Sequence, residues 1–289
     1  MRFGTLMPTS KKILHQWLQT DAAFGLDEVP IPHPKRQAAV PTIRPISRPA
    51  SPAPVFTHTS QSKIENQKSK IEIPAGDITV LPPLTKRQKA ELLEKLRQQT
   101  ESDSTPYINN ISTRLVFGEG DPDAALMFIG EGPGIEEDRT GRPFVGRSGQ
   151  LLDKMIAAMG LKRDPTGVAA GVYIANVVKL RCASPDPTNN GRLKDRPPTP
   201  DEAARGLPIL HHQIAIVRPR VIVTLGAPAI KHLTGTTQGV MSIRGTWLSF
   251  RGIPVMPTYH PSFLLRAYTE DNRRKVWNDL QLAMKKLKE

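Results

Sequence analysis

Side chains able to bind or activate a ligand follow three short apolar runs of this sequence. Glu131 comes just after one run, Asn176 lies near the end of a second, and His260 follows a third. A carboxylate can hold a water molecule or act as a base, a carboxamide can recognise the edge of a planar ligand, and an imidazole can donate a hydrogen bond. The carboxyl ends of parallel strands meet at one edge of a sheet, so we expect these three side chains to form one site.

The loop after the first run is rich in glycine. Its sequence is Gly130-Glu-Gly-Pro-Gly134, with three acidic residues just behind it at 136–138. Glycine after a buried strand lets a ligand approach the backbone amides closely, and the proline restricts the shape of the loop. A phosphate cradle would contain a lysine and a hydroxyl residue, so the acids argue against one.

Asn176 and His260 each allow a structural interpretation as well as a functional one. An unpaired buried carboxamide costs roughly 1–3 kcal/mol, so Asn176 either hydrogen-bonds a neighbouring loop or waits for a ligand. A histidine after a strand is often structural, but His260 precedes Pro261 in a rigid turn at the expected ligand-binding edge. Both interpretations stay open on the residues alone.

Apolar runs and helical periodicity alternate along the second half of the chain. The runs predict four strands, at residues 126–129, 172–178, 220–225 and 254–258. Helices are predicted at 85–99, from 148 to a stop at 160, and from 200 to 217. A short helix is predicted after Gly226, running through 233, and a last one from 270 to the basic C-terminus. Residues 244–253 are expected to form a hairpin or an irregular turn.

This alternation predicts an α/β fold, a three-layer α/β/α sandwich around a central, mostly parallel four-stranded sheet. The predicted domain spans residues 84–289. It is preceded by a disordered linker at 30–83 and a short amphipathic helical segment within 1–29. The linker is rich in proline and polar residues and cannot bury enough apolar surface to offset its ordering entropy. The amphipathic segment either docks on a protein partner or packs on the domain.

The charge of the chain favours a polyanionic partner. The net charge is +13, and residues 110–289 alone contain 25 basic and 17 acidic residues. A solvated basic surface would be the simpler explanation. No apolar run is long enough to span a membrane and the first residues lack the apolar core of a signal peptide, so we expect a cytoplasmic protein with no membrane contact.

Three blocks of motif residues resemble one family. They are Gly130-Glu-Gly-Pro-Gly134 with Gly141-Arg-Pro-Phe-Val-Gly146, then Asn176-Val-Val-Lys179, and then Thr258-Tyr-His-Pro-Ser with Leu264-Leu-Arg266. In this order and over residues 115–268 they resemble the family 4 uracil-DNA glycosylases. The resemblance implies excision of uracil from DNA by hydrolysis of the N-glycosidic bond, leaving an abasic site.

The resemblance also implies roles for single residues. Phe144 would stack on the flipped uracil, Asn176 would bind its N3–H and O4 edge, and His260 would bind O2. The backbone at Glu131 and Gly132 would close the pocket, and Glu131 or Glu137 would hold the attacking water. The residues that would enter the minor groove as a wedge are Leu264 and Leu265.

The sequence departs from the family in its cysteines. The family normally binds a [4Fe–4S] cluster through four cysteines. Counting from the motifs without gaps, the resemblance would put these positions at Asp103, Pro106, Leu180 and Gly206, and the single cysteine of the chain is Cys182. We therefore predict that the cluster is absent and that the protein needs no metal or other cofactor. The loop at 186–195 is long and is expected to fill the space of the cluster.

Two further functions stay open beside uracil excision. One is a non-catalytic DNA-binding protein on a glycosylase fold, and the other is a glycosylase for another deaminated base, because Gly134 leaves no bulky group to reject a thymine methyl. The pocket motifs are all present while every cluster ligand is missing, and this selective retention favours an enzyme. We expect a monomer that acts on uracil-containing DNA, single- or double-stranded.

Overall fold

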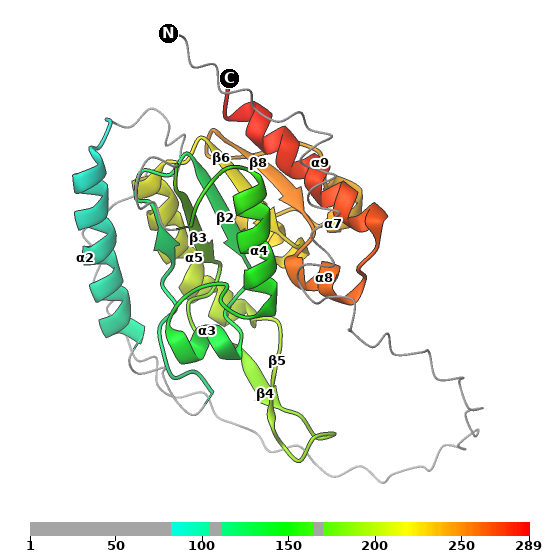
Figure 1. Ribbon diagram of the computed structural model, residues 1–289. Coiled ribbons are helices and arrows are strands. Elements are labelled where there is room, and N and C mark those ends of the chain that lie inside the picture. The colour runs from blue at the N-terminus through cyan, green and yellow to red at the C-terminus, as the bar shows by residue number, and fades with distance from the viewer. Residues whose placement is uncertain (1–81, 105–110, 164–169) are drawn as a thin grey trace. The chain divides into compact units, whose positions relative to one another are not determined.

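The computed structural model describes residues 82–104, 111–163 and 170–289 (Figure 1). All of them fall within one compact unit of the chain. The predictions for residues 1–29, and for all but the last two residues of the segment 30–83, lie outside the described residues.

A six-stranded mixed sheet forms the centre of the fold. Its strand order is β1-β3-β2-β6-β8-β7. The four inner strands are parallel, and they are β2 (Leu126–Gly130), β3 (Val172–Asn176), β6 (Val221–Leu225) and β8 (Ile253–Thr258). The two outer strands, β1 (Glu119–Gly120) and β7 (Leu248–Phe250), are short and antiparallel. The predicted α/β fold and its four parallel strands are confirmed, and the edge strands enlarge the sheet.

Helices cover both faces of the sheet. One face packs against α5 (Pro200–Val217) and α6 (Ala227–Thr234), and α2 (Lys86–Ser104) packs on α5. On the other face lie α4 (Arg147–Ala158) and α9 (Glu270–Lys286) (Figure 1). Three short helices lie in connections, and they are α3 (Ile135–Thr140), α7 (Val240–Ile243) and α8 (Pro261–Arg266). These layers are those of the predicted α/β/α sandwich.

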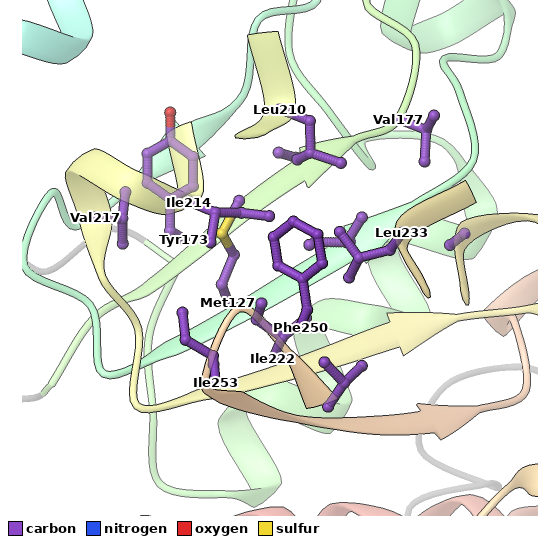
Figure 2. Packing of buried hydrophobic residues seen from close by; sticks show 14 of the residues in the cluster. Met127, Tyr173, Val177, Leu210, Ile214, Val217, Ile222, Leu233, Phe250 and Ile253 are labelled. Carbon is purple, nitrogen blue, oxygen red and sulfur yellow. The ribbon is translucent and has the colours of Figure 1, made fainter. Parts of the chain in front are cut away.

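The larger part of the core lies between the sheet and α5. Met127, Tyr173 and Ile222 point from three neighbouring strands towards Leu210 and Ile214 of α5 (Figure 2). The five residues of β2 are all buried, which explains why this strand reads as a continuous apolar run rather than an alternating one. The sheet is therefore a rigid base for the loops at its edge.

Local signals in the sequence determine where the long helices begin. The Thr199 hydroxyl accepts a hydrogen bond from the backbone N–H of Glu202, and the Glu202 carboxylate accepts one from the backbone N–H of Thr199. In the same way Thr269 caps α9 through the N–H of Asn272. Both caps agree with the sequence prediction. None of the helices in the described ranges is long and apolar enough to cross a membrane.

The residues between β3 and α5 form a separate two-stranded hairpin. It consists of β4 (Ala183–Pro185) and β5 (Leu193–Asp195), which pair in antiparallel register. The hairpin projects from the edge of the fold where α3 also lies (Figure 1). The long loop predicted at 186–195 is therefore partly ordered by β-pairing.

The strand order places a ligand-binding crevice at the end of β2. The chain passes from β2 to β3 on one side, and the next long crossover carries it to β6 on the opposite side of β2. Ligands of open α/β sheets bind outside the carboxyl ends of the strands at such a switch point. The glycine loop that follows β2 lies at this position.

Candidate active site

A cavity of about 600 Å³ lies at the predicted edge of the sheet. Its walls come from the loop after β2, the end of β3, the start of α4, the segment after β5, and α8. Seven of the eight predicted site residues line it, and they are Glu131, Gly132, Glu137, Phe144, Asn176, His260 and Leu265. The structure therefore brings together residues that are more than 100 positions apart in the chain.

Gly130, the last residue of β2, lets the ring of Phe144 and the carboxamide of Asn176 approach each other. A Cβ at position 130 would lie 2.5 Å from Oδ1 of Asn176 and 2.5 Å from Cζ of Phe144. A real Cβ atom essentially never lies so close to a non-bonded heavy atom. This glycine is thus required by a close approach of two side chains, not by an unusual backbone angle.

The side chain of Asn176 is buried, and its carboxamide oxygen has no partner among the described residues. The side chain is 1% exposed, and its Oδ1 accepts no hydrogen bond from any residue that the structure describes. Its backbone carbonyl accepts a hydrogen bond from Nζ of Lys179 at 2.7 Å. A buried acceptor without a donor is costly, so its pairing with an N–H of a bound ligand would be favourable.

One ring nitrogen of His260, Nδ1, is hydrogen-bonded within the protein, which leaves Nε2 for a ligand in the cavity. Nδ1 accepts a hydrogen bond from the backbone N–H of Ser262 at 3.0 Å, which places the proton of a neutral ring on Nε2. Burial, with a smaller contribution from Arg266, lowers the pKa of His260 to about 4. The ring is therefore neutral near pH 7 and can donate one N–H. It lies 5.7 Å from the ring of Phe144.

Glu131 has the properties of a group that holds a water molecule. Its Oε1 is buried and has no hydrogen-bond partner among the described residues. Burial raises the pKa of this carboxyl above its usual range. The backbone of Glu131 is anchored because its carbonyl accepts a hydrogen bond from the N–H of Val178 at 3.1 Å. An anchored carboxylate with a vacant acceptor can orient a nucleophile at the cavity wall.

Glu137, the other predicted water ligand, is occupied by the backbone. Its Oε1 accepts hydrogen bonds from the N–H groups of Val145 and Gly146, both at 2.8 Å, and its Oε2 accepts one from Gly134 at 3.2 Å. These contacts join the glycine loop to the turn that contains Phe144. The geometry thus favours a structural role for Glu137 and leaves Glu131 as the better candidate to hold water.

The contacts of Glu137 also explain why residue 134 is a glycine. A Cβ there would lie 2.9 Å from Oε2 of Glu137 and 3.3 Å from Oδ2 of Asp195. A larger residue would displace the carboxylate that holds the loop. The absence of a side chain at 134 is therefore needed by the loop itself, whichever base the cavity accepts.

The two predicted wedge residues lie in different environments. Leu264 is fully buried (0% exposed) and does not line the cavity. Leu265, the next residue of α8, is half-buried and lines the cavity. A wedge must leave the protein surface to enter DNA, so burial argues against Leu264 and leaves Leu265.

Sequence reasoning did not single out a buried lysine beneath the site. Lys179 is 3% exposed, and its Nζ donates to the carbonyl of Asn176 and, at 2.6 Å, to Oε1 of Gln213. Burial lowers the pKa of Lys179 to about 7. The lysine stands in the Asn-Val-Val-Lys motif three residues after Asn176, and this spacing was the one available signal.

The residues around the expected cluster positions do not suit an iron–sulfur cluster. Such a cluster needs four thiolates, and the sequence contains one cysteine. At the fourth position, Gly206 packs so closely on the backbone just after β3 that a Cβ would lie 2.3 Å from the carbonyl oxygen of Val177. No group of three or more metal-binding side chains occurs in the described part of the chain. In this region, ion pairs of Arg181 with Asp195 and of Arg196 with Glu202 join the hairpin and α5 to the fold.

The fold and the cavity define a class of α/β protein in which a cavity lined by polar and aromatic side chains lies at the switch point of a mostly parallel sheet. Within this class, the chain belongs to the uracil-DNA glycosylase superfamily. The profile described as "Uracil DNA glycosylase superfamily" matches residues 117–281, which contain the whole cavity and all four parallel strands.

Several curated relatives of similar sequence are uracil-DNA glycosylases. The chain is 40% identical over 199 residues to a type-4 uracil-DNA glycosylase of Thermotoga maritima, covering 68% of this chain and 94% of the relative. It is 38% identical over 206 residues to a type-4 uracil-DNA glycosylase of Sulfurisphaera tokodaii, covering 68% and 84%. A type-5 uracil-DNA glycosylase of Pyrobaculum aerophilum is 33% identical over 155 residues, covering 50% of this chain and 63% of the relative.

Proposed function

We propose that this protein is a DNA repair glycosylase that excises uracil from DNA by hydrolysis of the N-glycosidic bond. The observation that carries the proposal is the unpaired, buried Oδ1 of Asn176, which lies beside the ring of Phe144 in a cavity that also receives His260. A stacking ring, a vacant acceptor and a neutral donor match the face and the edge of a uracil base.

Recognition of uracil follows from the chemistry of these groups. The N3–H of uracil would donate to Oδ1 of Asn176, and the carboxamide nitrogen would donate to O4. Cytosine has no proton on N3 and carries an amine at position 4, so it would place like groups against Asn176. Phe144 would stack on the base, as an aromatic ring accepts any planar ligand of this size.

Cleavage would be promoted by two side chains that line the cavity, His260 and Glu131. As the bond between the sugar C1′ and N1 breaks, the base leaves with the electron pair and gains negative charge on O2. The Nε2–H of His260 would stabilise this charge, a kind of interaction that typically contributes about 2.7–4 kcal/mol to lowering the barrier. Glu131 would hold the water that adds to C1′ and would accept its proton.

The base must leave the DNA stack before it can enter the cavity. Base-modifying enzymes extrude the nucleotide at a cost of a few kcal/mol. Leu265 stands at the cavity wall and would occupy the gap that the base leaves, while Arg147, Arg196 and Arg266 also line the cavity and would face the phosphates. The monomeric state and a protein partner for the N-terminal segment stay predictions.

We also propose that excision proceeds without an iron–sulfur cluster. The single cysteine and the tight packing at Gly206 support this, and ion pairs involving Asp195 and Glu202 would supply part of the local stability. Purified protein should be colourless and free of stoichiometric iron. About four irons per chain, with the matching visible absorbance, would show that ligands from outside this chain complete a cluster.

A single assay separates the proposed function from its two alternatives. Purified full-length protein is incubated with matched oligonucleotides containing uracil, hypoxanthine or a thymine mismatch, and abasic product is measured. We expect cleavage of the uracil substrate, lost in Asn176→Ala at an unchanged melting temperature. Product from hypoxanthine or thymine alone would favour another deaminated base. Binding to all three oligonucleotides without product would leave the non-catalytic DNA-binding protein.

A further inference from the structure

The backbone of Phe144 has an unusual conformation. Its φ angle is +52°, in the left-handed region that bulky L-residues rarely occupy. The side chain is nevertheless buried, and its ring lies beside His260 and above Gly130. A conformation of this kind persists only where the surrounding structure holds it, and such residues concentrate at functional sites.

Arg163 holds this conformation through the carbonyl groups of the turn. One guanidinium nitrogen (NH1) donates to the carbonyl oxygen of Pro143 at 2.6 Å, and the other (NH2) donates to that of Phe144 at 2.7 Å. Two carboxylates fix the guanidinium in turn, since Glu119 accepts from NH1 at 2.9 Å and Asp153 accepts from Nε at 2.7 Å. The side chain of Arg163 is only 12% exposed.

The start of α4 encloses the same carbonyl from another side. A Cβ on Gly149 would lie 1.9 Å from the carbonyl oxygen of Phe144. The peptide after Phe144 therefore lies between Arg163 and the first turn of α4. The N–H of Val145, which belongs to this same peptide group, and the N–H of Gly146 both donate to Glu137. The turn that carries the ring is held at consecutive peptide groups.

We propose that Arg163 is a positioning residue for uracil excision, which holds Phe144 in its left-handed conformation within the turn 143–146 and so orients the ring of Phe144 for stacking on the base. This proposal rests on the proposed function. Arg163 itself need not touch the substrate, because it does not line the cavity. A planar guanidinium can reach four acceptors at once, while an ammonium group is a compact charge that cannot reproduce this fork.

The test compares Arg163→Lys with Arg142→Lys in the full-length protein. Arg142 donates to the same carboxylate, Glu119, while the described hydrogen bonds to the two carbonyls of the turn come from Arg163, and so Arg142 is the matched control. We expect Arg163→Lys to slow single-turnover uracil excision by about 10²-fold, as a misplacement of about 1 Å does, and to weaken inhibition by free uracil. Binding to DNA that contains an abasic-site analogue should be unchanged, because that ligand has no base to stack. Arg142→Lys should behave as the wild type.

A double-mutant cycle with Phe144→Ala shows whether Arg163 acts through the ring. If it does, Arg163→Lys causes little further loss once the ring is absent. Additive losses in the cycle, or a fall in melting temperature that accounts for the lost rate, would overturn the proposal.

Amide hydrogen exchange tests whether Arg163 holds the turn 143–146 even if the protein excises no uracil. The amides of Val145 and Gly146 should exchange faster in Arg163→Lys than in the wild type and in Arg142→Lys. If these amides exchanged at the wild-type rate in Arg163→Lys, Arg163 would not hold the turn 143–146. If they exchanged faster in a protein without uracil activity, only the proposed function would be refuted.

Discussion

The backbone N–H of Ser262 donates to Nδ1 of His260 at 3.0 Å, and this contact decides which ring nitrogen can face the cavity with a proton. The Ser262 hydroxyl lies 2.8 Å from the same nitrogen. Because His260 is the N-cap of α8 and Pro261 is the first residue of that helix, the turn is rigid. The site thus contains a preorganised hydrogen-bond donor rather than a mobile side chain.

Replacement of His260 by alanine should slow the chemical step and leave substrate binding almost unchanged. Loss of one donor to a developing anion typically costs about 2.7–4 kcal/mol, or on the order of 10²–10³ in rate. Single-turnover excision and the affinity for uracil-containing DNA measure the two effects separately. His232→Ala, on α6 away from the cavity, is the control. A folded His260→Ala protein with near-normal excision would remove His260 from the site.

Protonation of His260 should destabilise the fold in acid. The pKa is about 4 in the folded protein and near 6.5 in an unfolded chain, so the unfolded chain binds more protons between these values. The contribution of neutral His260 to the free energy of unfolding is therefore complete above pH 6.5 and is lost as the pH falls towards 4. Urea unfolding of the wild type and of His260→Ala at several pH values measures it. If the free energy of unfolding changed with pH in the same way in both proteins, the prediction would be contradicted.

The two glutamates should respond differently to removal of their charge. Glu131→Gln should slow excision without lowering the melting temperature, because the unpaired Oε1 supports no part of the fold. Glu137→Gln should lower the melting temperature, because the carboxylate accepts three backbone hydrogen bonds, and bonds to charged groups contribute roughly 1.5–3 kcal/mol each. Thermal melting beside single-turnover rates tests both. If Glu137→Gln alone abolished excision at full stability, the assignment would be reversed.

A single methyl group at position 130 should disrupt the site. Gly130→Ala would place a Cβ 2.5 Å from both Asn176 and Phe144, so one of these side chains must move away. We expect excision to fall by at least about 10²-fold, in line with the effect of misplaced binding groups. Gly160→Ala is a control for added volume at a place where a Cβ meets nothing within 4 Å, although its left-handed φ of +75° adds local strain. Normal excision by Gly130→Ala would show that the cavity relaxes.

The sequence by itself was sufficient for the order of the four parallel strands and the main helices, and for the sheet edge at which the cavity lies. The strands that end at Gly130, Asn176 and Thr258 are short apolar runs, and helix caps such as Thr199 are local signals that need no tertiary contact. The motif blocks identified the family for the same reason, because they are contiguous in the chain. The short helices α3 and α8 were not predicted, since six residues are too few to show a helical period.

Only the tertiary structure decided which side chains of these motifs are available. Glu131 and Glu137 look equivalent in the sequence, but three backbone N–H groups occupy one of them. Leu264 and Leu265 are neighbours, and the helix turns one into the core and the other towards the cavity. Apolar periodicity shows which elements are buried, but the partners of a single polar atom are brought together by folding and leave no periodic trace in the sequence. For this reason the chain's motifs indicate where the site lies, while packing determines which of its atoms remain unpaired.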